Sequence, residues 1–331
     1  MNPDIESFVY QSTKADKIEN KELIQTLWSG YGKIVRAKLQ GSSLDTVILK
    51  NVIFPTQSQH PHGWNTNHSH MRKARSYQVE MAWYKNWSLR CNTHCRIPKR
   101  YDSTSIGDEH LMILEDLDAA GFPLRKSHLS KRDVHLCLKW LAHFHATFLG
   151  EKPEGLWEIG TYWHLDTRPD EWGAMEEGDL KQAARYIDEL LNKCHYQTFV
   201  HGDAKVANFC FSANGKQVAA LDFQYVGGGC GMKDVVYFLG SCLHEEECAR
   251  WEDEFLDAYF SYLKEALLLR GNQVNWQDLE TEWRSMYPIA WADFYRFLLG
   301  WMPNHYKVND YSEQLAQQTL VQLKTQQKWV A

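Results

Sequence analysis

The chain has 331 residues, of which 44% are hydrophobic and 24% charged, and its formal net charge is −6 at pH 7. This length suffices for two domains or one two-lobed domain, and the composition is that of an ordinary globular protein. The negative charge argues against a general nucleic-acid-binding protein, and no apolar run approaches the about 20 residues of a membrane span. Because Met1 to Asn20 contains no signal-peptide-like apolar segment, we expect a cytoplasmic protein.

The first fifty residues predict a helix followed by two strands. Leu23, Ile24 and Leu27 have the spacing of one helical face. A predicted turn at residues 29–32, which contains Gly30 and Gly32, follows this segment. The next predicted elements are a strand from Lys33 to Leu39, a turn from Gly41 to Ser43 and a strand from Thr46 to Lys50. The second strand therefore ends in a lysine.

Two segments contain residue types that bind metals, but simpler interpretations are favoured. Gln57 to His70 holds four histidines among Pro, Gly and Asn residues, a composition typical of a loop. Cys91, His94 and Cys95 have no matching second pair at zinc-finger spacing, so we expect reduced, structural thiols.

The middle of the chain predicts a helix, two strands and then more helices. The first helix carries Glu80, and the second strand ends at Leu117. A long amphipathic helix has Ser130 as its expected N-cap, and it precedes a segment rich in Trp and Pro. In chain order the ranges are Lys73 to Trp87, Arg96 to Tyr101, His110 to Leu117, Leu129 to Leu149, Glu151 to Glu177 and Leu180 to Cys194.

The segment from Phe199 to Asn208 holds the residues with the clearest chemical signal, and Leu221-Asp222-Phe223-Gln224 follows it. Between them, Asn214-Gly215 predicts a type I′ hairpin turn. That turn would pair Asn208 with Leu221 and would place Asp222 one residue beyond, with Asp203 in the loop just before. Two oxygen ligands and a further carboxylate suit Mg²⁺ and a base for an attacking hydroxyl.

The chain then predicts mainly helices. Gly227-Gly228-Gly229 predicts a flexible segment, and Asp234 is expected to cap the helix after it. A later helix carries a stripe of aromatic residues, and Pro288 is expected to kink or break it. The predicted helices are Glu254 to Leu268, Trp276 to Trp301 and Glu313 to Lys328.

His201-Gly202-Asp203, Asn208 and Asp222 resemble the catalytic and metal-binding loops of eukaryotic-like kinases. The His-Gly-Asp form is similar to that of aminoglycoside, choline and ecdysteroid kinases, and the chain after Asp222 looks most like the ecdysteroid-kinase-like and choline-kinase-like families. The resemblance implies a bilobal, protein-kinase-like α+β fold. Residues 1–118 would form an N-lobe of antiparallel sheet plus helix, and residues 119–331 a mostly helical C-lobe.

The resemblance also implies ATP and Mg²⁺ as cofactors and a role for each matched residue. Asp203 would orient the acceptor hydroxyl, and Lys205 would neutralise charge on the transferred phosphoryl group. Asn208 and Asp222 would hold Mg²⁺. The ATP phosphates would contact the Lys50–Glu80 ion pair and the turn with Gly30 and Gly32. The backbone near Glu115 and Leu117 would contact adenine. Val35 stands at the third glycine position of the protein-kinase pattern.

The expected acceptor is a small molecule with a hydroxyl group. Gly202 in place of Arg, and the lack of an Ala-Pro-Glu motif after Asp222, argue against a protein kinase. An apolar alcohol and a choline-like amino alcohol both fit the aromatic-rich C-lobe, while an aminoglycoside-type kinase and a pseudokinase without turnover remain alternatives. We expect a monomer or weak dimer.

We expect the acceptor between the Trp157–Trp172 segment and the Trp283–Trp301 helix, where Trp163 and Trp291 would face it. Asp293 would supply a carboxylate to a cationic acceptor.

Overall fold

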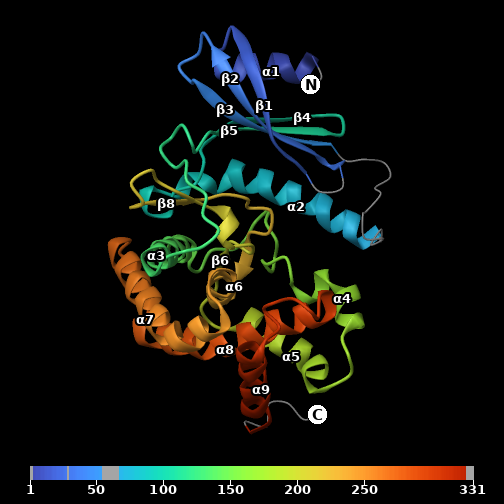
Figure 1. Ribbon diagram of the computed structural model, residues 1–331, viewed down its shortest axis with the longest axis vertical. Coiled ribbons are helices and arrows are strands. Elements are labelled where there is room, and N and C mark those ends of the chain that lie inside the picture. Colours follow the sequence, from blue (N-terminus) through green and yellow to red (C-terminus); the bar gives the residue numbers. More distant parts are fainter. Residues whose placement is uncertain (1–2, 28–29, 54–66, 326–331) are drawn as a thin grey trace. The chain divides into compact units, whose positions relative to one another are not determined.

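The computed structural model describes residues 3–27, 30–53 and 67–325, and these residues form two compact units (Figure 1). The N-unit comprises residues 1–92, 96–124 and 210–221, and the C-unit comprises residues 93–95, 125–209 and 222–331. The predicted lobe boundary after residue 118 stays a prediction. Contacts between residues continue the N-unit to residue 124 and add the hairpin segment 210–221 to it.

The N-unit is an antiparallel five-stranded sheet with two helices, drawn mostly in blue and teal in Figure 1. The strand order is β1-β2-β3-β5-β4. Helix α1 contributes Ile5 and Val9 to a core that includes Val35 and Leu49 of the sheet. The elements are α1 (Pro3–Thr13), β1 (Lys17–Thr26), β2 (Gly32–Gln40), β3 (Thr46–Ile53), α2 (Asn67–Asn86), β4 (Arg100–Ile106) and β5 (Glu109–Glu115).

The helix predicted from Leu23, Ile24 and Leu27 is wrong, because the chain forms strand β1 up to Thr26. Strand β1 pairs with β2 at one edge of the sheet, and every residue of it after Ile18 is exposed. Where both faces of an edge strand are exposed, burial does not select a regular spacing of apolar residues in the sequence. The helix-like spacing of the apolar residues therefore does not mark a buried helical face.

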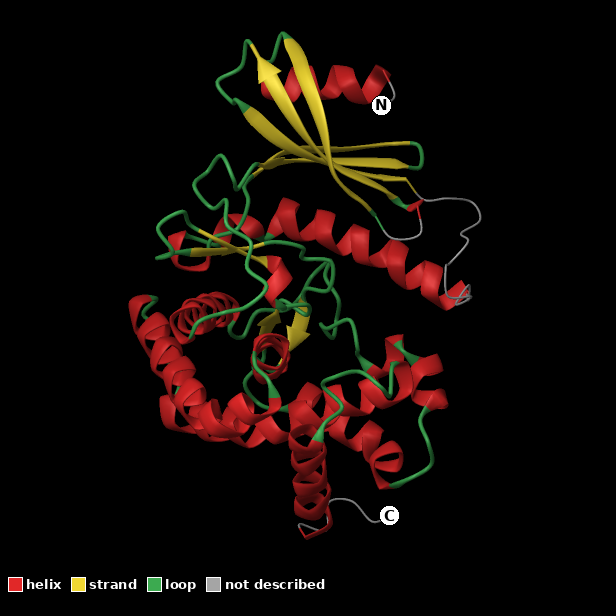
Figure 2. Cartoon of the chain, in the orientation of Figure 1, coloured by secondary structure: helices red, strands yellow, loops and turns green. Residues whose placement is uncertain are grey.

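The C-unit is mostly helical, as Figure 2 shows in red, and the fold class is the predicted protein-kinase-like α+β class. Ser130 caps α3 as predicted, since its hydroxyl accepts from the Asp133 N–H and the Asp133 carboxylate accepts from the Ser130 N–H. The helices are α3 (Lys131–Phe148), α4 (Pro169–Ala174), α5 (Asp179–Lys193), α6 (Met232–Cys242), α7 (Glu245–Leu269), α8 (Trp276–Trp301) and α9 (Asp310–Thr325). Helix α8 continues through Pro288 without a break.

The glycine run at residues 227–229 is a buried strand and not the predicted flexible segment. It forms β9 (Gly227–Gly229), which pairs antiparallel with β6 (Thr198–Val200), the strand that leads into the His201-Gly202-Asp203 segment. A Cβ at Gly227 would lie 2.3 Å from Trp157 O, and one at Gly228 would lie 2.6 Å from Glu158 O. Glycine is needed there because another backbone passes too closely for any side chain.

The hairpin after Asn208 is present, but its turn is not the predicted type I′ turn. Strands β7 (Phe209–Phe211) and β8 (Val218–Ala220) form a two-stranded sheet. The Ser212 N–H donates to Gln217 O at 2.9 Å, which agrees with the predicted register. Gly215 has a φ of +62°, whereas Asn214 is not among the described residues with positive φ. A type I′ turn needs positive φ at both positions, so the loop is longer than two residues.

Most of the predicted histidine-rich loop from Gln57 to His70 lies outside the described residues, because these omit residues 54–66 with His60 and His62. Residues 67–70 of that segment begin helix α2. Among the described residues, no group of three or more His, Cys, Asp and Glu side chains could hold a metal ion, and the eight cysteines form no disulfide. Within the same ranges, no helix is both long and apolar enough to cross a membrane.

We predict that Gly227→Ala lowers the free energy of unfolding by about 1–3 kcal/mol, because its Cβ would overlap the Trp157 backbone. Gly173→Ala is the matched control. Gly173 lies in α4 and a Cβ there would meet nothing within 4 Å, so that change should be neutral or slightly stabilising. Urea unfolding of both variants measures the difference, and equal stability of the two would contradict close backbone packing at β9.

Candidate active site

The Asp203 carboxylate is the centre of the site and is 6% exposed. Its Oδ1 accepts a hydrogen bond from the Tyr237 hydroxyl at 3.0 Å. Its Oδ2 accepts from Lys205 Nζ at 2.8 Å and from Asn208 Nδ2 at 3.0 Å. Three donors thus fix the orientation of a carboxylate that lies in the loop between β6 and β7.

Asp234 of α6 holds the backbone of this loop. Its carboxylate has no exposed surface and accepts from the His201 N–H at 2.5 Å and from the Gly202 N–H at 2.9 Å. His145 Nε2 lies 3.1 Å from the same carboxylate, while His145 Nδ1 lies 2.7 Å from the Tyr259 hydroxyl. A histidine that donates through Nε2 accepts through Nδ1, so Tyr259 is the donor in the second bond.

Gly202 has no room for a side chain. Its φ is +78°, and a Cβ there would lie 2.2 Å from Tyr225 O and 2.8 Å from Thr161 N. The Gly202 carbonyl also accepts from the Tyr162 N–H at 3.2 Å. The residue before Asp203 must therefore be glycine, because both its conformation and its surroundings exclude a larger residue.

Asn208 and Asp222 lie at the open ends of the β7–β8 hairpin. Asn208 Nδ2 donates to both Asp203 O, at 2.7 Å, and Asp203 Oδ2. Its amide nitrogen is thereby committed to the loop, which directs its amide oxygen away from Asp203. Asp222 is partly exposed and has a φ of +69°. An amide oxygen and a carboxylate are oxygen ligands of the kind that Mg²⁺ prefers, and their binding of one ion stays a prediction.

The charges in the loop influence one another. Burial opposes the charge of Lys205, but the carboxylates of Asp203 and Asp222 outweigh it and raise the pKa of Lys205. Burial, together with the charge of Asp203, raises the pKa of Tyr237 well above its ordinary value. Lys205 is therefore a cation and Tyr237 a neutral donor at neutral pH.

In the N-unit, Lys50 and Glu80 form the expected ion pair. Lys50 Nζ lies 2.6 Å from Glu80 Oε2 and 2.9 Å from Glu80 Oε1, and both residues are buried. Lys50 comes from β3 and Glu80 from α2, so the pair joins the sheet to the helix. Its contact with nucleotide phosphates stays a prediction.

The other predicted nucleotide contacts also lie in the N-unit. Gly32 starts β2, and a Cβ there would lie 2.0 Å from Asn51 O, so sheet packing alone requires a glycine. A Cβ at Gly30 would meet nothing within 4 Å. The Glu115 N–H donates to Lys99 O, and Leu117 O accepts from the Phe122 N–H. The contact of the backbone near Glu115 and Leu117 with adenine stays a prediction.

Residues 46–152 and 165–271, about two thirds of the chain, match the profile of the Ecdysteroid kinase-like family. The chain belongs to this family. No match was found among curated proteins. The sequence prediction of a small-molecule kinase-like family is confirmed.

Solved structures resemble this ecdysteroid kinase-like chain in fold. A choline kinase from Cryptosporidium parvum Iowa II is 10% identical, with a TM-score of 0.52 over 98% of this chain and 96% of that chain. The GDP complex of aminoglycoside 2'-phosphotransferase-IIIa is also 10% identical, with a TM-score of 0.50 over 97% and 99%. At such low identity, these likenesses show the fold alone.

Two residues expected to contact the acceptor are instead part of the core of the ecdysteroid kinase-like C-unit. Trp163 has no exposed surface, and its Nε1 donates to Asp293 Oδ2 at 3.0 Å. Asp293 also accepts from Arg296, at 3.0 Å from Nε and 2.7 Å from Nη2, and neither side chain is exposed. The proposal that Asp293 binds a cationic acceptor is wrong, because Arg296 already neutralises it.

Sequence reasoning missed three residues of the site. The sequence does not indicate which residue His145 contacts. Asp234 was expected only to cap a helix, and Tyr237 was not singled out. All three act on the loop from positions more than 30 residues away in the chain. The polar residues in the otherwise apolar runs around His145 and Asp234 were the available signal.

We predict that Asp234→Ala lowers the free energy of unfolding by more than about 2 kcal/mol, because two buried N–H groups lose their charged acceptor. Asp253→Ala removes the same charge from an exposed position on α7 and should change stability by less than about 0.5 kcal/mol. Chemical denaturation of both variants tests this. Wild-type stability in Asp234→Ala would show that the loop does not depend on Asp234.

Proposed function

We propose that this chain is an ATP- and Mg²⁺-dependent phosphotransferase whose acceptor is the hydroxyl group of a small molecule. The observation that carries the proposal is the Asp203 carboxylate, buried and held by Tyr237, Lys205 and Asn208. Membership of the Ecdysteroid kinase-like family supports a kinase-like activity. The solved structures with the same fold include a choline kinase and the GDP complex of an aminoglycoside phosphotransferase.

Each residue of the chain would perform one task in the transfer. Asp203 would accept a hydrogen bond from the acceptor hydroxyl and turn its oxygen toward the phosphoryl group. Lys205, a cation on the same loop, would lie where charge develops on the transferred group. Phosphoryl transfer depends mainly on such positioning and neutralisation, so this small set of side chains suffices.

Asn208 and Asp222 are the residues that would hold Mg²⁺. Bound there, the ion would neutralise nucleotide phosphates. Lys50, kept in place by Glu80, would bind phosphate oxygens from the N-unit.

We predict that Asp203→Asn lowers turnover by about 10²-fold or more while nucleotide affinity stays within about twofold. The amide can keep some of the hydrogen bonds of the loop but cannot serve as a carboxylate for the hydroxyl. Asp166→Asn, at an exposed aspartate that pairs with Arg185, is the control. ATP-dependent phosphorylation of a panel of small alcohols is the assay. Near-normal turnover in Asp203→Asn would exclude Asp203 from the chemistry.

We predict that nucleotide binding depends on Mg²⁺ and that Asp222→Asn weakens the Mg²⁺-dependent part at least about tenfold. Asn is preferred to Ala in this test because it tolerates the positive φ at this position. Calorimetric titration of ATP with and without Mg²⁺ measures both effects. If Mg²⁺ does not change the affinity of the wild type, Asp222 and Asn208 are not its ligands.

A further inference from the structure

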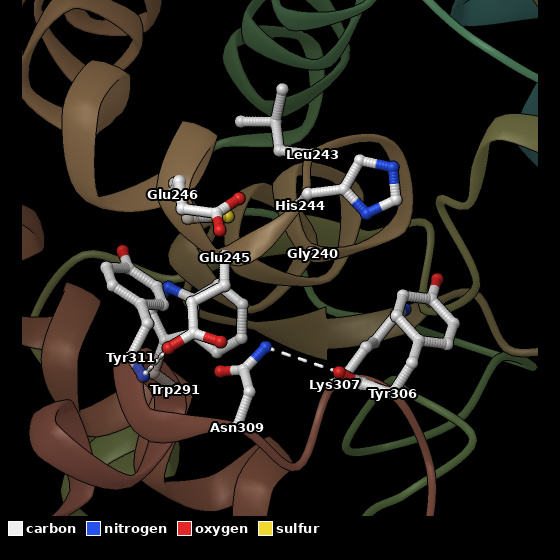
Figure 3. Close-up of a pocket in the computed structure, with 11 residues that line it drawn as sticks. Gly240, Leu243, His244, Glu245, Glu246, Trp291, Tyr306, Lys307, Asn309 and Tyr311 are labelled. Atoms are coloured by element: carbon white, nitrogen blue, oxygen red, sulfur yellow. Dashed lines mark hydrogen bonds between the residues drawn. The ribbon is translucent and has the colours of Figure 1, made fainter.

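Lys307 is a buried lysine in the segment between α8 and α9, where it lines a pocket of about 250 Å³ (Figure 3). It is 8% exposed, and among the residues that the structure describes no carboxylate forms an ion pair with it. The acidic residues of the pocket are engaged elsewhere, since Glu245 Oε1 accepts from the Tyr311 N–H at 3.2 Å and Glu246 is exposed. The ammonium group of Lys307 is therefore held by something other than an acidic side chain.

Aromatic rings surround that ammonium group. The ring centroids lie 4.8 Å from Lys307 Nζ for Tyr237, 5.2 Å for Phe294 and 5.8 Å for Tyr306. The nearest ring, that of Tyr237, is itself buried. The π electrons of an aromatic face attract a cation, and this attraction increases where water is excluded. Lys307 and Tyr237 therefore form a buried cation–π pair.

The hydroxyl group of the same ring holds Asp203. It donates to Asp203 Oδ1 at 3.0 Å, while Lys205 and Asn208 bind Oδ2. In the proposed transfer, Lys205 would also neutralise the phosphoryl group and Asn208 would also hold Mg²⁺. The hydroxyl of Tyr237 is the donor to Asp203 that has no second task in that reaction, so its strength bears directly on the orientation of the carboxylate.

We propose that Lys307 is a positioning residue for Asp203 and that it acts through the ring of Tyr237. This inference rests on the proposed phosphotransferase function and adds to it a residue that acts through another side chain. A positive charge on the face of a phenol ring draws electron density from the ring and makes the hydroxyl proton more positive. The hydroxyl then donates a stronger hydrogen bond, because polar groups polarise one another where the local dielectric is low.

Packing alone does not explain a lysine at this position. A methionine would pack against Tyr237 and Phe294 without the cost of burying a charge. Burial lowers the pKa of Lys307 to about 8, against the attraction of nearby acidic groups that include Asp203. The folded chain thus retains, within electrostatic reach of Asp203, a charge that burial disfavours.

The first test is the turnover of three variants with ATP and a panel of small alcohols. Lys307→Met should lower kcat by about fivefold to thirtyfold while KM for ATP stays within about twofold, because the charge acts on Asp203 and not on the nucleotide. Lys307→Arg keeps a cation on the ring and should retain most of the turnover. Lys264→Met is the matched control and should change nothing, since Lys264 is an exposed lysine on α7 with its Nζ 5.6 Å from the Trp276 ring centroid.

A double-mutant cycle tests the route through Tyr237. Tyr237→Phe keeps the ring beside Lys307, removes the hydroxyl and should lower kcat at least as much as Lys307→Met does. In the Tyr237→Phe background, Lys307→Met should change kcat by less than about twofold, because the hydroxyl on which the charge acts is gone. A lysine that only supports the fold would instead lower the melting temperature and reduce turnover by the same factor in both backgrounds.

A second readout does not need turnover. In the full chain labelled with ¹³C at the Cζ atom of tyrosine, the NMR signal of Tyr237 is the one that is missing from Tyr237→Phe. A phenol that donates a stronger hydrogen bond has its Cζ signal further downfield. The signal should therefore move upfield in Lys307→Met, remain near its wild-type position in Lys307→Arg and be unchanged in Lys264→Met.

The same signal should depend on pH in the wild type. Lys307 is charged below its pKa of about 8 and neutral above it, so the signal should move upfield between pH 7 and 9, but not in Lys307→Met. Helix α8 contributes the ring of Phe294 to the surroundings of Lys307. The titratable groups that face it are Tyr237 and Cys242 on α6, Cys248 on α7, Asp203 and Lys205 in the loop, and His305 and Tyr306 on its own segment.

Those neighbours do not change charge in this range of pH. Burial raises the pKa of Tyr237, Tyr306 and both thiols, so these groups remain neutral. Burial lowers the pKa of His305, which is therefore neutral above pH 7. Burial opposes the charge of Lys205, but the adjacent carboxylates outweigh it and raise the pKa of Lys205, which stays charged.

The outcomes separate this inference from the proposed function. An unmoved Tyr237 signal in Lys307→Met, wild-type turnover in that variant, or independent effects of the two substitutions in the cycle would each overturn the inference. If no small alcohol is phosphorylated but the Tyr237 signal responds to Lys307 as expected, the action of Lys307 on Tyr237 is supported. In that case the phosphotransferase proposal alone would fail.

Discussion

The buried carboxylate of Asp234 is the constraint on which the geometry of the candidate active site depends. A charge without exposed surface is stable only if polar groups surround it, and the groups available here are the N–H groups of His201 and Gly202 and the ring of His145. The loop before Asp203 thus supplies the solvation of Asp234. Because neither partner can move without leaving the other unsatisfied, the backbone that carries Asp203 is held in one conformation.

This constraint explains why glycine precedes Asp203 and why β9 is made of glycines. With two consecutive N–H groups directed at Asp234, Gly202 takes a φ of +78°, and its other side faces Tyr225 O. Strand β6 reaches this point only by pairing with β9, over which Trp157 and Glu158 pass at backbone distance. The three-layer contact of β6, β9 and the 157–160 segment leaves no space for side chains.

The sequence was informative where the chemistry is local. Asp203, Lys205 and Asn208 lie within six residues, the resemblance to kinases assigned them to one site, and the structure joins them by hydrogen bonds. Lys50 and Glu80 could be paired only through their order relative to the resembled kinases. The residues that hold the site from a distance were not predictable, because hydrogen bonds such as His145 to Asp234 span 89 residues. Nothing in the local pattern of either residue indicates the other.

The aromatic residues of the C-unit show what helical spacing in the sequence predicts and what it does not. Helical spacing in α8 predicted a packed stripe, and Trp283, Phe294 and Leu298 are indeed buried. The same spacing could not show which aromatic residues border an open pocket, since Trp163 and Trp291 are both almost completely buried, and Trp291 nevertheless lines a pocket. Burial of a side chain and access to a ligand are independent properties, and only the second depends on how neighbouring helix ends leave space.

Lys307 gives this distinction an energetic basis. Its segment connects α8 to α9, where an apolar residue would pack against Tyr237 and Phe294 without a desolvation cost. A lysine there is less favourable for the folded state, as the lowering of its pKa by burial indicates. Asp293 and Arg296, buried nearby in the same unit, neutralise each other and so can be explained by folding alone. Lys307 has no such carboxylate among the described residues, so the folded chain carries at Lys307 a desolvation cost of the kind that the Asp293–Arg296 pair offsets.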